Sequence, residues 1–198
     1  MLRLRGVLII GLGAGLCFGA TCVRAQSEYE GCSILQGDAQ SAAKRPSPLG
    51  VTVITLGGRE AKLCYGRPSA RGRTMLGGND PFGEPWRLGA NEATALHLPF
   101  TAVIGTVPVG PGSYSLYVIP GPDEWEVFVN ANAERWGIPI DERVRAEDVG
   151  SFKVPVSATK GMVEQLTCTW VQDGGSAGRL VFEWEHTHVE IPVSLPGK

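Results

Sequence analysis

Short segments in which apolar and polar residues alternate recur along most of the chain. In Ser113–Ile119, for example, Tyr114, Leu116 and Val118 fall on one side. A period of two residues is that of a half-buried β-strand, whereas no stretch shows the period of an amphipathic helix. Clusters of glycine and proline such as 108–112 separate the segments and are typical of turns. The pattern therefore predicts an all-β domain, a sandwich or barrel of about ten short antiparallel strands.

The predicted strands begin with a hairpin, Val51–Leu56 and Glu60–Tyr65, whose arms are joined by two glycines. The other predicted strands are 94–100, 103–107, 113–119, 124–130, 152–157, 164–171, 179–184 and 189–195. The last two differ in parity, since the apolar residues have even numbers through Trp184 and odd numbers from Val189. A change of apolar face requires a turn or bulge, which this pattern places at Glu185–His188.

The first residues have the pattern of a secretory signal peptide. Two arginines precede an apolar run, and the small residue Ala25 suits cleavage. We therefore predict a signal peptide at 1–25, a flexible linker at 26–48 and a single β domain at 49–198, exported to the periplasm or the extracellular space. A retained N-terminal anchor is the alternative, although the apolar run is shorter than the ~20 residues of a membrane span. No later run is long enough to cross a membrane.

The charge and the cysteine content of the chain argue against some classes of function. The chain carries 18 basic and 20 acidic residues, and three of the basic ones lie in the predicted signal peptide. An acidic exported domain is a poor nucleic-acid binder, because phosphate recognition needs a basic face. Cys32, Cys64 and Cys168 follow the signal peptide, so at most one intramolecular disulfide can form among them, and its pairing stays open. Their spacing fits no zinc site, and we predict neither a metal nor a cofactor.

The most distinctive stretch is an irregular insertion, Arg67–Asn91, rich in glycine, proline and arginine. Long irregular connections inside compact domains are often functional. Guanidinium groups present planar forks of donors that suit carboxylate, sulfate or phosphate groups. We therefore predict a binding module for a small anionic or polyhydroxylated, sugar-like ligand. The predicted ligand-binding residues are Tyr65, Arg67, Arg71, Arg73, Trp86, Arg87, Asn91 and Glu92.

Two alternatives remain open for this stretch. In the first, the protein is a hydrolase or lyase in which Glu92 is the catalytic acid or base and Arg67 or Arg87 stabilises negative charge. In the second, the arginines pin the loop by binding its carbonyl oxygens and by pairing with Asp80, Glu84 and Glu92. The protein is then a structural component of the envelope. The sequence does not indicate an oligomeric state.

The 3 histidines form no recognisable catalytic motif. His186 and His188 lie in the predicted turn or bulge, where they are either solvated or, with Glu185 and Glu190, a weak transition-metal site. His97 alternates with leucines and is predicted to be exposed or to face a second layer. Spacing alone supports no Ser-His-Asp or Cys-His arrangement.

Two sequence motifs frame the insertion. They read Tyr65-x-Arg67-Pro68-x-x-x-Gly72-Arg73 and Pro81-Phe82-Gly83-x-x-Trp86-Arg87-x-Gly89-Ala90-Asn91-Glu92-Ala93-Thr94. Together with weaker matches between Pro46 and Leu195, they resemble a bacterial exported family known as domain-of-unknown-function family 2911. The resemblance implies an exported, mostly-β domain and no particular reaction.

Overall fold

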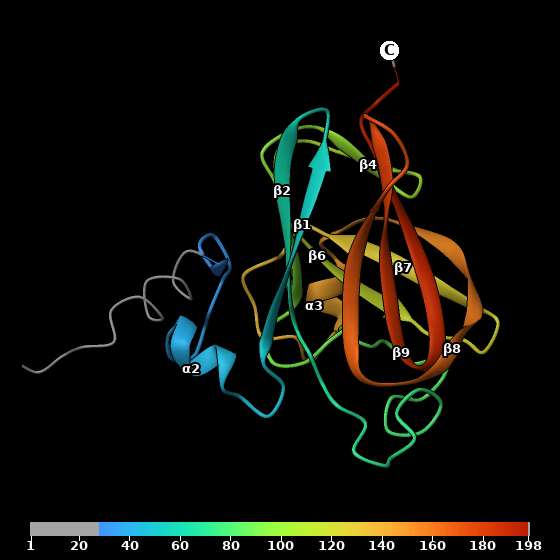
Figure 1. Ribbon diagram of the computed structural model, residues 1–198. Coiled ribbons are helices and arrows are strands. Elements are labelled where there is room, and N and C mark those ends of the chain that lie inside the picture. The colour runs from blue at the N-terminus through green and yellow to red at the C-terminus, as the bar shows by residue number, and fades with distance from the viewer. Residues whose placement is uncertain (1–27, 198) are drawn as a thin grey trace, which may run out of the picture.

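The computed structural model describes residues 28–197, so the predicted signal peptide and its cleavage near Ala25 lie outside the described residues. Across the described residues, nine antiparallel strands form one sheet in the order β1-β2-β3-β6-β7-β8-β9-β4-β5 (Figure 1). The strands are β1 Leu49–Leu56, β2 Arg59–Gly66, β3 Thr94–Leu98, β4 Ala102–Ile104, β5 Val107–Val109, β6 Gly112–Ile119, β7 Glu124–Asn130, β8 Asp148–Gln172 and β9 Ala177–Ser194. The helices of this part of the chain are short, α2 Ala39–Ala43 and α3 Glu142–Arg145.

The sheet bends along β8, so that its two halves enclose one core (Figure 1). Residues 148–155 of β8 pair with β7, and residues 156–172 pair with β9. The halves also meet where the Tyr65 hydroxyl on β2 accepts a hydrogen bond from the backbone N–H of Cys168 on β8, at 2.7 Å. No pairing among the described strands joins β1 to β5, so the sheet is not closed into a barrel. The all-β prediction is confirmed, in the form of a bent sheet with a sandwich-like core.

Four of the predicted segments are joined into two long strands. β8 contains both 152–157 and 164–171, and β9 contains both 179–184 and 189–195. Bulges separate the paired segments, because the β8–β9 register shifts between Ala158 and Val163 and again between Val163 and Thr167. Glu185 has φ 53°, and the alternation of β9 changes face there. The predicted irregularity at Glu185–His188 is therefore a bulge inside a continuous strand.

The predicted hairpin is confirmed as β1 and β2. Gly57 and Gly58 have φ of 58° and 72°, which a two-residue turn between twisted strands requires. In contrast, the single strand predicted at 103–107 is divided between β4 and β5. Gly105 turns the chain between them at φ 58°, and its missing side chain leaves room for the ring of Phe152.

The described part of the predicted linker, residues 28–48, is attached to the domain. A disulfide joins Cys32 to Cys64 on β2, and α2 packs near β1. Cys168 is buried and unbridged. The disulfide is compatible with an oxidising, exported environment. No helix in residues 28–197 combines the length and apolarity needed to span a membrane.

Candidate functional site

Three arginines of the insertion bind backbone carbonyl oxygens of the same chain. The donors are Arg67, Arg71 and Arg73. Their acceptors are the oxygens of Leu166 for Arg67 (3.2 Å), Pro46 for Arg71 (3.0 Å), and Ala70 (2.9 Å) and Ser69 (3.0 Å) for Arg73. Only Arg73 binds carbonyl oxygens of the insertion itself, whereas Arg67 ties the insertion to β8 and Arg71 ties it to the N-terminal segment. The predicted ion pairs of these arginines with Asp80, Glu84 and Glu92 do not form among the described residues, and Glu92 pairs with Arg45 instead.

The two aromatic residues predicted to line the site belong to the core. Tyr65 is 4% exposed and packs edge-on against Phe182. Trp86 is 5% exposed and stacks on Trp184, with ring centroids 5.5 Å apart. It also meets Trp125 edge-on at 5.7 Å. Trp86 therefore anchors the irregular insertion to the sandwich rather than presenting a face to solvent.

At the end of the insertion, the side chain of Arg87 meets the backbone of Asn91, whereas the carboxylate of Glu92 binds other partners. Nη1 of Arg87 lies 3.4 Å from the carbonyl oxygen of Asn91, which precedes Glu92. Partial burial lowers the pKa of Arg87, and the nearby carboxylate of Asp80 opposes this shift. No described contact connects Arg67, Arg71 or Arg73 to this group.

Glu92 is buried under the N-terminal segment. Its Oε2 accepts from Nη1 of Arg45 at 2.7 Å, and its Oε1 accepts from the backbone N–H of Leu35 at 3.1 Å. The side chain of Arg45 is 15% exposed, and that of Glu92 is 8% exposed. Asn91 is held by the same segment, because its Nδ2 donates to the carbonyl oxygen of Ser47 at 2.9 Å. An acid–base role for Glu92 would therefore require Arg45 to move away first.

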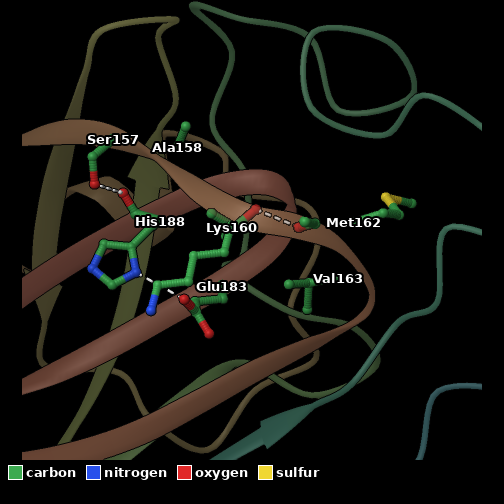
Figure 2. A pocket seen from close by; sticks show the side chains of 9 residues that line it. Ser157, Ala158, Lys160, Met162, Val163, Glu183 and His188 are labelled. Atoms are coloured by element: carbon green, nitrogen blue, oxygen red, sulfur yellow. Dashed lines mark hydrogen bonds and ion pairs between the residues drawn. The ribbon is translucent and has the colours of Figure 1, made fainter.

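A hollow of about 580 Å³ with both polar and apolar lining lies where β8 bulges away from β9. Its polar lining comes from Ser157, Thr159, Lys160, Glu183 and His188. Met162 and Val163 add apolar surface. Figure 2 shows Lys160 extending toward the pair formed by His188 and Glu183. The bulge thus gathers a cation, a carboxylate, an imidazole and hydroxyl groups around one concave surface.

His188 is held between two carboxylates. Its Nδ1 lies 2.9 Å from Oε1 of Glu183, and its Nε2 lies 3.3 Å from Oε1 of Glu190. The hydrogen bond to Glu183 is the main cause that raises the pKa of His188, against a smaller opposing effect of burial. The imidazolium form can donate to both carboxylates, whereas the neutral ring can donate to only one. In contrast, Lys160 makes no ion pair or side-chain hydrogen bond among the described contacts.

The insertion supports the strands that form this hollow. The backbone N–H groups of Met75 and Leu76 donate to the two carboxylate oxygens of Glu185, at 3.0 and 2.9 Å. The backbone N–H of Arg71 donates to Oε1 of Glu164 at 2.7 Å. Glu164 and Glu185 both lie in the bulged part of the β8–β9 pair. The Arg/Gly-rich insertion therefore holds the bulge in place from one side.

Sequence reasoning placed the site in the insertion and missed the hollow beside it. The available signal was the change of apolar parity on β9, which coincides with two of the histidines. Of these two histidines, His186 is exposed to solvent and only His188 lines the hollow. Within residues 28–197 no group of three or more His, Cys, Asp or Glu side chains is arranged to hold a metal ion.

Residues 47–193 match the family described as Protein of unknown function (DUF2911). The chain belongs to the DUF2911 family. The match covers the insertion, all nine described strands in whole or nearly in whole, and the hollow, so the resemblance inferred from the two insertion motifs is confirmed. The curated proteins contain no match to this DUF2911 chain. The solved structures contain none either.

Proposed function

We propose that this DUF2911 protein is an exported binding module for a small acidic, polyhydroxylated ligand, which it binds in the hollow between β8 and β9. The proposal rests on Lys160, a cation without a partner among the described contacts, which lines the same hollow as the imidazole of His188. The proposal keeps the predicted ligand class, and it places the ligand next to the insertion instead of inside it.

The shape of the hollow supports a small-molecule ligand. Its volume of about 580 Å³ falls within the ~300–1,000 Å³ that ligand sites usually span. β-Bulges often lie next to functional sites because they redirect side chains and interrupt pairing. Here the two register shifts on β8 open the space that Lys160 and Met162 line.

The polar groups favour a ligand that has both hydroxyls and an acidic group. Lys160 offers three N–H donors, which suit a carboxylate or phosphate. The hydroxyls of Ser157 and Thr159 can donate to and accept from ligand hydroxyls, and the carboxylate of Glu183 can accept from them. Glu183 also repels a ligand that is purely anionic, so a hydroxyl-rich acid such as a uronic acid fits better than an inorganic anion.

Thermal unfolding tests this proposal with glucuronate, glucose and inorganic phosphate as the probes. Glucuronate at about a hundred times its dissociation constant should stabilise the wild type by ~2.7 kcal/mol, which raises Tm by several degrees. Lys160→Ala should lose this shift. Lys153→Ala is the matched control, because Lys153 lies on the same strand but pairs with Glu124 at 2.7 Å outside the hollow. If no probe shifts Tm, or if Lys160→Ala shifts as the wild type does, the proposal is wrong.

A further inference from the structure

A second polar row crosses the outer face of the half of the sheet that contains β2, β3 and β6. Lys62 on β2 is the register partner of His97 on β3, and His97 is the register partner of Ser113 on β6. Directly paired residues of antiparallel strands point to the same face with Cβ atoms about 5 Å apart. The three side chains therefore form one line, and they border a hollow of about 510 Å³ that is separate from the one at β8–β9.

His97 and Ser113 are hydrogen-bonded. Nδ1 of His97 lies 2.8 Å from Oγ of Ser113, and Ser113 is exposed to solvent. Nε2 of His97 is buried and has no hydrogen-bond partner among the described residues. Because a neutral imidazole carries one N–H, a hydrogen on Nε2 leaves Nδ1 free to accept the proton of the serine hydroxyl.

The surroundings of His97 favour its neutral form, which can accept a proton. Burial is the main cause that lowers the pKa of His97, and this shift favours the neutral ring. Lys62 lowers this pKa further, and the carboxylate of Glu134 opposes both effects. Lys62 donates one of its three N–H groups to the carbonyl oxygen of Glu30 at 3.0 Å, which leaves two donors for another acceptor.

We propose that Ser113 is a nucleophile that His97 activates, and that the protein hydrolyses small carboxylic esters in this hollow. Oγ of Ser113 attacks the ester carbonyl carbon while its proton moves to Nδ1 of His97. The ammonium of Lys62 stabilises the negative charge that develops on the carbonyl oxygen. The ester C–O bond then breaks, and the leaving alcohol takes the proton from His97. Water then attacks the acyl carbon of the acyl-serine while one of its protons moves to Nδ1 of His97. The bond to Oγ of Ser113 breaks, Oγ takes the proton back from His97, and the acid is released.

This activity goes beyond ligand binding at the β8–β9 hollow, and it is tested separately. The purified protein is incubated with an alkyl fluorophosphonate, which forms a P–O bond to an activated serine with loss of fluoride. Peptide mass spectrometry then locates the adduct, and 4-nitrophenyl acetate measures turnover. We expect an adduct on Ser113, and we expect His97→Gln to slow labelling by about a hundredfold. Lys153→Ala should leave labelling unchanged, because Lys153 pairs with Glu124 and borders neither of the two hollows.

The matched control is Ser151→Ala. Ser151 is an exposed serine on the outer face of the same half of the sheet, but its hydroxyl donates to Glu126 at 2.8 Å instead of meeting a histidine. Absence of an adduct on Ser113, equal labelling of Ser151, or labelling that His97→Gln leaves unchanged would each overturn the proposal. Should His97→Gln fail to fold, the pH profile of the wild type decides. Labelling must rise through a single pKa below the ordinary ~6.5 of histidine and stay level above it.

Discussion

The insertion and the β8–β9 hollow hold similar charged groups in opposite situations. In the insertion, Arg67, Arg71 and Arg73 each donate to carbonyl oxygens of the chain. In the hollow, Lys160 borders open space and has no partner among the described contacts. The comparison teaches that a dense run of charge does not locate a binding site. What matters is whether the fold supplies the partners of each charge, because a satisfied donor has little to offer a ligand.

The largest expected effect concerns the way the insertion is anchored. Trp86→Ala should lower the free energy of unfolding by about 4 kcal/mol, because it leaves a cavity between two other buried tryptophans. Urea unfolding measures this loss. Trp170→Ala is the control, since Trp170 is only partly buried. A loss of less than about 1 kcal/mol in Trp86→Ala would show that the insertion is loosely attached and would remove the contrast between the two regions.

The next largest effect concerns the ion pair between Arg45 and the buried carboxylate of Glu92. Arg45→Ala should cost about 3 kcal/mol, because it leaves the buried carboxylate of Glu92 without its charged partner. The double variant Arg45→Ala with Glu92→Gln should recover part of this loss, since no buried charge then remains. Chemical unfolding of the wild type, Arg45→Ala, Glu92→Gln and the double variant completes the double-mutant cycle. Additive losses would show that the ion pair contributes nothing of its own.

A smaller effect compares the two regions directly. Arg67→Ala should lower the free energy of unfolding by about 1.5 kcal/mol, because it leaves the Leu166 carbonyl without its charged donor. Lys160→Ala should change it by no more than about 0.5 kcal/mol, because Lys160 is exposed and has no partner to lose. Urea unfolding of both variants under the same conditions gives the difference. Equal losses would mean that Lys160 is also structural.

The smallest expected effect depends on pH. The pKa of His188 is raised in the folded state, so its contribution to stability is fully present below the unfolded pKa of ~6.5 and is lost as pH rises through the folded pKa. The size should stay below about 1 kcal/mol, because Glu183 and Glu190 are 38% and 41% exposed. Unfolding of the wild type and His188→Gln from pH 5 to 9 measures it. A difference between the two proteins that grows with pH would contradict the prediction.

Much of the fold could be predicted because β-periodicity is a local property. The β1–β2 hairpin, β6 and β7 agree with the predicted segments, and the parity change between Trp184 and Val189 located a bulge. Local patterns could not show that the segments on either side of a bulge belong to one strand. That depends on whether β8 and β9 keep pairing past the irregularity, which their register shifts allow.

The candidate sites were less accessible to sequence reasoning. Tyr65 and Trp86 have polar tips and occur next to arginines, so nothing local distinguishes a core residue from a ligand-binding one. His97 and Ser113 lie 16 residues apart and meet only because β3 pairs with β6. Arg45 reaches Glu92 across 47 residues through a segment predicted to be a linker.

Local patterns specify the strand class, the hairpin and the position of the bulge on β9, because period-two alternation and turn glycines act on neighbouring residues. The two motifs of the insertion identify the family. The tertiary structure alone decided which charges are satisfied. It joined Arg67 to Leu166, Arg45 to Glu92 and Cys32 to Cys64, and it left Lys160 facing a hollow. The physical reason is that a partner distant in sequence is chosen by strand register and by the packing of one half of the sheet on the other, neither of which a local pattern contains.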